Sequence, residues 1–592
     1  MSSTAQLART EAPSIFRQQR SWLAPALISG VVCLVYLGTV GFQFVYDDPF
    51  QIVDNSWLSW HYIPQYFTKH VWAFAGISGV YWRPLFLLWL LFQHALFGTS
   101  PAGFHAFTVL LHALATVLVY GLALRLTRDR ATAIIAALIF GVHPALIESV
   151  AWVSGCTDPL LACWLIAAFL AFLNWREYHS GPWLLASLGA YALALMSKEP
   201  AVMLLPLVSV FTFLVAATDS GWIPRARSAA MAVLPYLPLT LIYGLIHHII
   251  EARMDRSGNP ATPLKMALTA PSLLLFYLRL LVFPWPISPE YEMKLVPRFS
   301  TTAVLLPSIA LIAIFVAIYA WTRFLARTGD DRSARVVRFA SLWMLLPIMP
   351  VLYIAALAAQ DFAHARYLYL SCIGFALLLA CAIRRVPGPE HRALNVPLTQ
   401  AAIATVIIGA LAVGNIMQQG HWASNLLLFY RGTRIAPHNP IALTGLGIEM
   451  GKRRQYDKAL ALLHDAMDQD AWDQHTNFSL GYTYYLMGRY IEAEPYLERG
   501  VEIRPEDVHA DQFAYVAMTE LKLGKLPKAE WAIRQSVQRQ PHSEKYHYAL
   551  GLILEQQGKA ADAARAFEAT LAINPGNADA RARMVRLQGA AQ

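Results

Sequence analysis

The chain has 592 residues, 56% of them hydrophobic, and a mean hydropathy of +0.41. Soluble globular domains are about 45–50% apolar, so this composition excludes an ordinary soluble protein and places most of the chain in lipid. The formal charge is +9, but the basic residues stand in short clusters between apolar runs. This distribution argues against nucleic acid as a partner and favours the loops of a membrane protein.

The first apolar run follows a polar segment, residues 1–21, which contains Arg9, Arg17 and Arg20. The run is long enough to cross a bilayer and lacks a convincing small-x-small cleavage site. We therefore expect a membrane helix at 22–43 rather than a cleavable signal, and we place residues 1–21 in the cytoplasm.

Clusters of Lys and Arg in short loops set the orientation, because these residues resist translocation. All the clusters can be cytoplasmic only if an even number of helices separates successive ones. Eleven helices within residues 22–417 satisfy this condition: 22–43, 104–124, 131–147, 159–175, 183–197, 200–217, 229–247, 302–321, 339–358, 367–383 and 398–417. Outer loops are then expected at 44–103, 143–158, 248–301 and 359–366, and the C-terminal part lies outside.

Two further apolar stretches are left out of this count. Residues 84–97 are too few to span a bilayer vertically and are bounded by Pro84 and Gly98, so we expect a helix that lies at the outer interface. Residues 266–283 carry Arg279 and end in a proline-rich segment, which favours an interfacial or re-entrant helix. If both stretches cross, the count is thirteen and the later topology is unchanged.

A repeat of about 34 residues follows a linker helix at 418–439, with copies starting near 440, 474, 510 and 544. Small residues recur at the eighth and twentieth positions of each copy, and a bulky residue recurs at the twenty-fourth: Gly447, Gly481, Ala517 and Gly551; Ala459, Ala493, Ala529 and Ala563; Leu463, Leu497, Ile533 and Phe567. This spacing is typical of the tetratricopeptide repeat, in which two antiparallel helices approach closely. Residues 440–592 are therefore predicted to form four repeats and a C-terminal capping helix.

The predicted fold class is all-α, a helical membrane bundle followed by an α-solenoid. The concave face of such a solenoid usually holds an extended polypeptide. A spacer or an oligomerisation module is the alternative.

Ionisable residues gather at the outer ends of the predicted helices. They are Asp47, Asp48, Asp54, Arg83, His105, His112, His143, Glu148, Asp158, Lys198, Glu199, Arg279, Glu290, Glu292, His364 and Arg366. Convergence of acids and bases from several loops is a stronger sign of function than any one of them.

Several of these residues stand in motifs that resemble a known family. The motifs are FVYDDPFQIVDN at 44–55, YWRPL at 81–85, FHAFTVLLHA at 104–113, HPALIESVAWVSGCTD at 143–158, SKEP at 197–200 and ARYLYLSCIGF at 365–375. Together with the repeats, they resemble the transmembrane and tetratricopeptide repeat-containing proteins, which are glycosyltransferases of the GT-C type. The resemblance implies transfer of mannose from a dolichyl-phosphate donor to Ser or Thr of a protein.

The resemblance places the catalytic carboxylate in the Asp47–Asp48 pair. Adjacent carboxylates cannot aim at one atom, so one is expected to be the base that deprotonates the attacking hydroxyl and the other a positioning partner. Asp48 is slightly preferred as the base, because it precedes Pro49 and has no helical neighbour.

The leaving group is a lipid phosphate and needs positive charge. The candidates are Arg366, Lys198 and Arg83, with Arg366 the first choice. The structural alternatives are a helix-end arginine that snorkels at Arg366, an anchor for the interfacial helix at Arg83, and an ion pair between Lys198 and Glu199.

Further acids and histidines are expected near the acceptor or the sugar: Glu148, Asp158, His143 and Glu199. Their spacing fits no compact metal-binding motif, and the five cysteines offer neither zinc spacing nor a disulfide framework, so a divalent cation is left open and no metal ligand is assigned. His105 and His112 lie seven residues apart on one helical face, which more often indicates packing or interhelical hydrogen bonds.

Two motifs depart from the family pattern. Gly155-Cys156-Thr157-Asp158 stands where the family tends to have Gly-Arg-x-Asp, and Ala365-Arg366 stands where it has Glu-Arg. One charge is missing on each side of the expected site, so the sugar need not be mannose.

The sequence thus favours a membrane glycosyltransferase that takes one hexose from a polyprenyl-phosphate donor and gives it to a protein held by the repeats. The short N-terminal segment and compact loops favour a bacterial inner membrane, with the repeats in the periplasm. A non-catalytic scaffold anchored in the membrane is the alternative. A transporter would place acids in the middle of spans, where this sequence has almost none.

Overall fold

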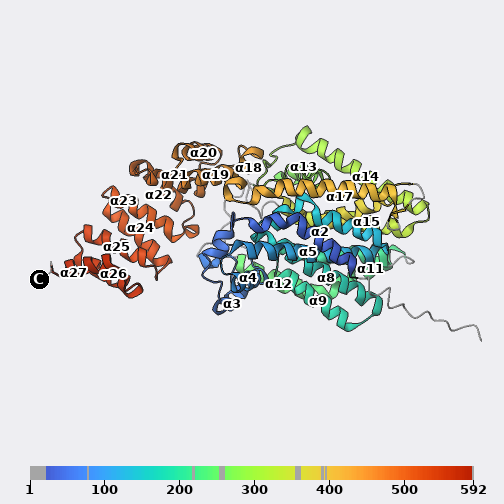
Figure 1. Cartoon of the computed structure of the whole chain (residues 1–592), viewed down its shortest axis with the longest axis horizontal. Coiled ribbons are helices and arrows are strands. Elements are labelled where there is room, and N and C mark those ends of the chain that lie inside the picture. Colours follow the sequence, from blue (N-terminus) through green and yellow to red (C-terminus); the bar gives the residue numbers. More distant parts are fainter. Residues whose placement is uncertain are drawn as a thin grey trace, which may run out of the picture.

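The computed structural model describes residues 22–75, 79, 81–216, 221–251, 261–353, 362–388, 392–393 and 396–589. Figure 1 shows a helical bundle whose helices run mostly along the long axis, with a curved row of helix pairs extending from one end. Within the described ranges, the only strands are two-residue segments, β1 (Arg392–Ala393) and β2 (Val396–Pro397), paired antiparallel. The all-α prediction is confirmed.

The bundle helices are α2 (Leu23–Tyr36), α4 (Pro84–Phe97), α5 (Pro101–Thr127), α6 (Arg130–Val142), α7 (Ile147–Ala151), α8 (Thr157–Tyr178), α9 (Gly181–Leu195), α10 (Leu204–Phe211), α11 (Trp222–Val233), α12 (Leu237–Glu251), α13 (Pro263–Val282), α14 (Leu306–Arg327), α15 (Asp331–Leu345), α16 (Tyr369–Ile383) and α17 (Leu398–Gln419). Among the described residues, nine helical segments are long and apolar enough to span a membrane, or ten if the bent pair around His143 is one span. A multi-pass membrane bundle follows.

The nine spans among the described residues differ from the predicted eleven in four places: two predicted spans are short, the one predicted at 131–147 is the bent pair, and α13 is counted although it was not predicted to cross. Residues 183–197 fall on α9 and residues 200–217 on a helical stretch from Glu199 to Leu214, and both are under 18 residues long. The predicted N-terminal segment 1–21 lies outside the described residues, as do parts of the helix predicted at 339–358 and of the loops predicted at 248–301 and 359–366.

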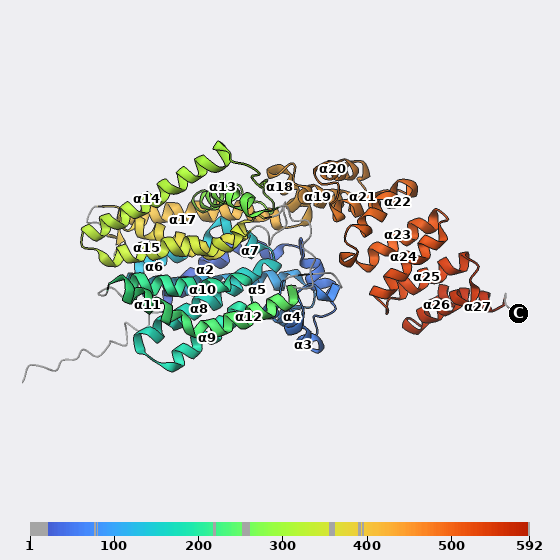
Figure 2. The same cartoon turned by 180° about the vertical axis from the view of Figure 1, so that it is seen from behind.

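The stretch at 266–283 corresponds to α13, which is long and apolar enough to span. Its contacts nevertheless run along one end of the bundle. Thr269 accepts a hydrogen bond from the backbone of Val296, while the carbonyl of Leu281 lies 2.9 Å from His143. Two positions twelve residues apart therefore meet outer-loop segments, and Figure 2 shows α13 across the direction of its neighbours. The interfacial placement of this stretch stays a prediction from the sequence.

The core of the bundle lies between α5, α6, α8, α15 and α16. Gly374 of α16 faces the backbone of Ala340 and Met344 so closely that a Cβ would fall 2.4 Å from Ala340 O. His112 joins two other helices, with Nδ1 2.7 Å from Tyr369 Oη and Nε2 3.0 Å from Gly141 O. The predicted interhelical role of this histidine is confirmed.

One face of the bundle carries bare apolar side chains. On α14 they include Ile309, Ile312, Phe315, Val316 and Tyr319, all more than half exposed. A continuous apolar helix face of this kind is stable in lipid rather than in water.

The linker and repeat helices are α18 (Asn425–Ile435), α19 (Pro440–Lys452), α20 (Tyr456–Gln469), α21 (Gln474–Leu486), α22 (Tyr490–Glu502), α23 (Ala510–Lys522), α24 (Leu526–Arg539), α25 (Glu544–Gln556), α26 (Ala560–Ile573) and α27 (Ala578–Gly589). The first helix of each pair begins at the residue where a repeat was predicted to start. A Cβ on Gly481 would fall 2.6 Å from the side chain of Leu497, so the small eighth residue admits the bulky twenty-fourth.

Candidate functional site

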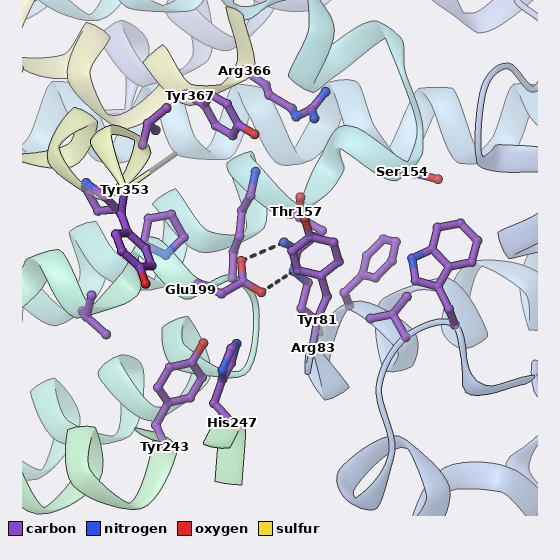
Figure 3. Close-up of a pocket in the computed structure, with 18 of the residues that line it drawn as sticks. Tyr81, Arg83, Ser154, Thr157, Glu199, Tyr243, His247, Tyr353, Arg366 and Tyr367 are labelled. Carbon is purple, nitrogen blue, oxygen red and sulfur yellow. Dashed lines mark hydrogen bonds and ion pairs between the residues drawn. The ribbon is translucent and has the colours of Figure 1, made fainter. Parts of the chain in front are cut away.

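A cavity of about 570 Å³ opens at the end of the bundle that faces the repeats. Eight separate segments contribute to its walls: residues 47–51, 71–72, 81–86, 152–157, 198–202, 240–248, 350–353 and 366–367. Figure 3 shows the Arg83–Glu199 pair on one side of the cavity and Arg366 with Tyr367 on another. Its polar lining includes Asp47, Arg83, Thr157, Lys198, Glu199 and Arg366.

The two adjacent aspartates have different surroundings. Asp47 lines the cavity and is half-buried. Asp48 is fully buried behind the wall, where Oδ1 accepts hydrogen bonds from Ser154 N at 2.8 Å and Ser154 Oγ at 2.6 Å, and Oδ2 accepts from Val45 N at 3.2 Å. Burial raises the pKa of Asp48 to about 6, and the bonds from Ser154 and Val45 oppose that rise.

Arg83 and Glu199 form a two-pronged ion pair across the cavity. Nε and Nη2 of Arg83 lie 2.9 and 2.7 Å from the two carboxylate oxygens of Glu199. Arg83 also precedes α4 directly, so it fixes the start of that helix to the turn after α9. Such planar, paired hydrogen bonds hold the guanidinium in one orientation.

The adjacent Lys198 pairs with a different acid. Its Nζ lies 2.6 Å from Asp158 Oδ1, and the other oxygen of Asp158 accepts a hydrogen bond from Ser149 Oγ. Both side chains are only 7% exposed. The alternative of a Lys198–Glu199 pair is wrong, because Lys198 has extended backbone and the two successive side chains point to different partners.

Arg366 is held by Glu148, which is fully buried. One carboxylate oxygen bonds to Nη1 of Arg366 and the other to its backbone N at 3.0 Å. The guanidinium lies 5.5 Å from the centre of the Trp152 ring, and the side chain is 20% exposed. An arginine bound at two points to a buried acid is not a snorkelling helix-end residue.

His143 lies apart from the cavity. Its Nε2 is 2.9 Å from Leu281 O, and its Nδ1 accepts the backbone N–H of Ala145. These contacts join the break between α6 and α7 to the end of α13, so the side chain is not among those that line the cavity. The predicted sugar or acceptor role of His143 has no support in this geometry.

Aromatic side chains form much of the cavity wall. They were not predicted from the sequence, where only the ionisable residues indicated a site. They are Trp72, Tyr81, Trp152, Tyr243, Tyr353 and Tyr367, with His247 and His248 of α12 beside them. Only folding brings them together, since they come from six of the eight segments. Gly155 was noted only as part of a motif, yet a Cβ there would fall 2.6 Å from Glu148 O, so this glycine lets the second outer loop fold back on itself.

Comparisons with known proteins bear on both parts of the chain. Residues 83–243 match the family described as "Dolichyl-phosphate-mannose-protein mannosyltransferase", and residues 452–514 and 517–578 match tetratricopeptide repeats. "Protein O-mannosyl-transferase TMTC3" of Mus musculus is 24% identical over 93% of this chain and 64% of its own length. "Protein O-mannosyl-transferase TMTC1" of Homo sapiens is 25% identical over 70% of this chain and 52% of its own length.

The chain therefore spans less than two thirds of the length of these relatives. Among solved structures, the crystal structure of YrrB, a TPR protein, is 18% identical and covers 28% of this chain and 83% of its own, with a TM-score of 0.26. The resemblance predicted from the motifs is confirmed by the mannosyltransferase match and by relatives that cover both halves of the chain.

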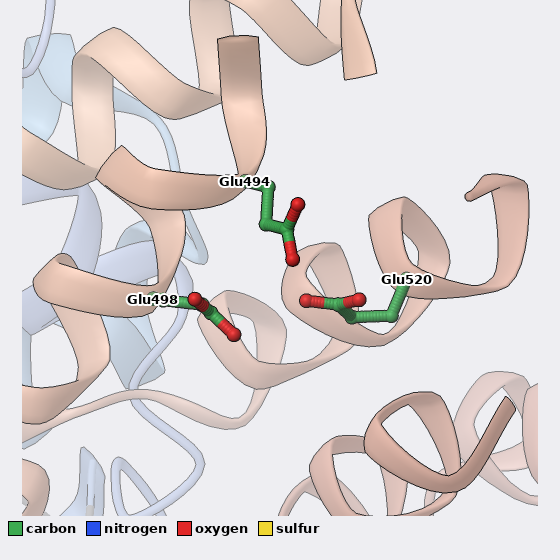
Figure 4. A group of neighbouring side chains, drawn as sticks. All are labelled: Glu494, Glu498 and Glu520. Carbon is green, nitrogen blue, oxygen red and sulfur yellow. The ribbon is translucent and has the colours of Figure 1, made fainter. Parts of the chain in front are cut away.

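Three glutamates in the repeats form the one group of metal-ligand type found among the described residues. Figure 4 shows the carboxylates of Glu494, Glu498 and Glu520 facing one another, and their nearest oxygens lie within 4.8 Å. Lys525 pairs with Glu494, and Lys528 lies 2.6 Å from Glu498. Glu520 is 1% exposed, and burial, with the charges of Glu494 and Glu498, raises its pKa to about 7. We interpret the group as an acidic cluster whose negative charge is neutralised in part by these two lysines.

The stability of the repeats should depend on the ionisation of Glu520. Its folded pKa lies above the ordinary value of 4.5, so the folded state binds more protons between pH 4.5 and 7 and loses stability as the pH rises through that window. We expect Glu520→Gln to raise the melting temperature of the repeats by a few degrees at pH 8 and by little at pH 5, measured by circular dichroism. Glu502→Gln, at an exposed position, is the control. An equal effect of Glu520→Gln at both pH values would contradict this account.

Proposed function

We propose that this chain, a homologue of the protein O-mannosyl-transferases, transfers a single hexose from a polyprenyl-phosphate donor to Ser or Thr of a protein held by the repeats. One observation supports this most directly: a single cavity beside the repeats gathers an acid, Asp47, and three cations, Arg83, Lys198 and Arg366, from four segments of the chain. Sugar transfer to a hydroxyl needs a base for the hydroxyl and positive charge for the departing phosphate.

Asp47 is the proposed general base. Its position on the cavity wall allows it to reach a hydroxyl bound there, whereas the carboxylate of Asp48 accepts three protein hydrogen bonds behind the wall. This assignment replaces the slight preference for Asp48 that was drawn from the sequence alone. Asp48 acts as the positioning partner, because its bonds tie the loop after α2 to Ser154.

Arg366 is the proposed first contact of the donor phosphate. It is the most exposed of the three cations, and Glu148 fixes it at the backbone and at the guanidinium, so it is ordered before the donor binds. An arginine fork matches phosphate oxygens. Lys198 and Arg83 add positive charge from the opposite wall. Glu148, Asp158 and Glu199 serve mainly to orient these cations.

The donor's lipid tail can approach past α12. Tyr243, Gly244 and His247 of this helix line the cavity, while Leu241, Leu245 and Ile249 are more than half exposed on the outside of the bundle. A helix with one face on the cavity and the other toward lipid places the site next to the bilayer. This arrangement supports lateral entry of a polyprenyl donor.

We further propose that the N-terminus is cytoplasmic and that the cavity and the repeats lie on the outer side. Basic residues at the far end of the bundle support this orientation: Arg332, Arg384 and Arg385 meet around Asp129 and Asp330. The bacterial inner membrane stays a prediction from the sequence.

Replacing the two aspartates should separate their roles. Asp47→Asn removes the base and should lower turnover about 100-fold or more. Asp48→Asn keeps the shape of the side chain, but its amide NH₂ group cannot accept a hydrogen bond from one of the three donors. We therefore expect turnover to fall roughly 10-fold. Membranes incubated with radiolabelled polyprenyl-phosphate mannose or another hexose, followed by counting of protein-bound label, would measure both.

The pH profile gives a second distinction. In the unmodified chain, Asp48 takes up a proton as the pH falls through about 6, which weakens its acceptor role at Ser154. The acid-side loss of turnover should therefore diminish in Asp48→Asn. A larger loss of turnover in Asp48→Asn than in Asp47→Asn would reverse the assignment.

The Arg366 variants should affect the donor more than the fold. Arg366→Ala should reduce turnover at least about 10-fold, and Arg366→Lys should recover only part of it, because an ammonium cannot provide the two-pronged contact. Size-exclusion chromatography of the detergent-solubilised protein controls for folding. Unchanged turnover in Arg366→Ala would remove this residue from the donor site.

We propose that transfer requires no divalent cation bound by Glu148 and Asp158. Each of these acids already has a protein cation within ion-pair distance, Arg366 for Glu148 and Lys198 for Asp158, so a metal would have to displace it. Activity should persist when the membranes are treated with excess EDTA. Loss of activity that Mn²⁺ or Mg²⁺ restores would contradict this proposal.

A further inference from the structure

The loop that carries both aspartates has a strained backbone next to them. We call residues 42–54 the aspartate loop. Tyr46 has φ of 56°, in the left-handed region that large side chains rarely adopt. Such a conformation is strained and persists only where the surroundings determine it. The aspartate loop therefore needs an external partner to hold the residue that precedes Asp47.

That partner is the linker helix α18. Oδ1 of Asn425, the first residue of α18, accepts a hydrogen bond from the backbone N–H of Tyr46 at 2.8 Å. The ring of Tyr46 also meets that of Phe429 at 6.0 Å. Just before the helix, the carbonyl of Ala423 accepts the backbone N–H of Gln43 at 3.1 Å. Three contacts from one short segment thus hold the start of the aspartate loop.

The same helix is part of the packing of the repeats. Phe429 lies against Gly445 of α19, where a Cβ would fall 2.4 Å from the phenylalanine ring. Any residue larger than glycine at position 445 would force the Phe429 ring to shift. A displacement of the first repeat would therefore displace Phe429 and, with it, the partner of Tyr46.

A second contact joins the loop to the middle of the repeats. The Phe50 ring stacks on the His509 imidazole, with centroids 5.7 Å apart and planes at 20°. Phe50 lies in a π-helical turn (Pro49–Val53) that begins immediately after Asp48. His509 is the N-cap of α23, where its backbone N–H is bound by the side chain of Gln512, so its position is fixed relative to that repeat.

The two contacts lie on either side of the aspartates. Asn425 holds position 46, His509 meets position 50, and Asp47 and Asp48 lie between them. A stacked pair of rings and a hydrogen bond are contacts of comparable, modest strength. Neither contact belongs to the cavity wall, so both act on the site only through the loop.

We propose that Asn425 and His509 are positioning residues through which the linker helix and the repeats hold the aspartate loop in the conformation that turns Asp47 toward the cavity. This inference rests on the proposed function for its effect on turnover. Its structural part, the dependence of the loop on Asn425 and His509, stands independently. The module that is proposed to hold the acceptor protein thereby also sets the geometry of the base.

Amide hydrogen exchange of the full chain in detergent tests the structural part without any substrate. Asn425→Ala should speed exchange in peptides that cover residues 42–54 by about 10-fold or more, while peptides from α5 and α8 stay unchanged. Asn425→Asp keeps an acceptor oxygen at the first helical position and should restore the slow exchange. His509→Ala should speed exchange of the same peptides to a smaller degree, and His542→Ala, at an exposed histidine in the next inter-repeat turn, should not.

The catalytic part is tested with the labelled-donor assay described above. Asn425→Ala should lower kcat while leaving KM for the donor unchanged, and Asn425→Asp should recover kcat. Exchange in residues 42–54 that is the same in Asn425→Ala as in the unmodified chain would overturn the inference. So would faster exchange with an undiminished kcat. If the unmodified chain shows no transfer, the proposed function fails, while the exchange data still decide whether the repeats hold the loop.

Discussion

A charge removed from water needs a partner, and the cavity end of this bundle meets that condition with three ion pairs between distant segments. Arg83 pairs with Glu199, Lys198 with Asp158, and Arg366 with Glu148, over separations of 116, 40 and 218 residues. In an environment of low dielectric constant, removal of one partner leaves a buried charge that costs about 3–5 kcal/mol. Each pair therefore fixes the relative position of two loops, and the cavity is the space that these loops enclose.

The pairs also determine what kind of chemistry the cavity favours. The acid of each pair is at least as buried as its cation in two of the three cases, with Glu148 fully enclosed and Arg366 20% exposed. Glu148 lies behind Arg366, so this pair presents its positive charge toward the cavity. Of the Lys198–Asp158 pair, only Lys198 lines the cavity. Because the cations are already oriented, little reorganisation is needed when a phosphate departs as an anion. Asp47 and Glu199 both line the cavity, and both carboxylate oxygens of Glu199 are bound by Arg83.

Different parts of the fold were predictable to different degrees. The repeats follow from local spacing, because a small residue at the eighth position and a bulky one at the twenty-fourth meet within a single helix pair, as Gly447 and Leu463 do. The outer-end residues Asp47, Arg83, Lys198, Glu199 and Arg366 could be gathered by charge and topology alone. Which acid pairs with which base could not be predicted, because it depends on side-chain direction in loops whose backbone is irregular.

The choice between Asp47 and Asp48 shows the same limit. It depends on the left-handed backbone of Tyr46 and on the hydrogen-bond donors of Ser154, which is 106 residues from Asp48 in the chain. Neither feature can be predicted from two adjacent aspartates in a sequence. The number of membrane spans was mispredicted for a different reason, the length of the helices. Apolarity and the charge rule cannot distinguish a full crossing from a short helix such as α9, whose length becomes clear only when its ends are seen.

Cys156, one of the residues at which the sequence departs from the resembled family pattern, lies close to the acids of the site. The thiol is fully buried, and its electrostatic neighbours are Asp48, Asp158 and Lys198. A cation at this position, as in the family pattern, would lie near both carboxylates and would favour their ionised forms. Here Lys198 neutralises Asp158, whereas Asp48 has only the neutral donors of Ser154 and Val45, which do not fully offset burial. The raised pKa of Asp48 thus follows from its burial, which these neutral donors offset only in part.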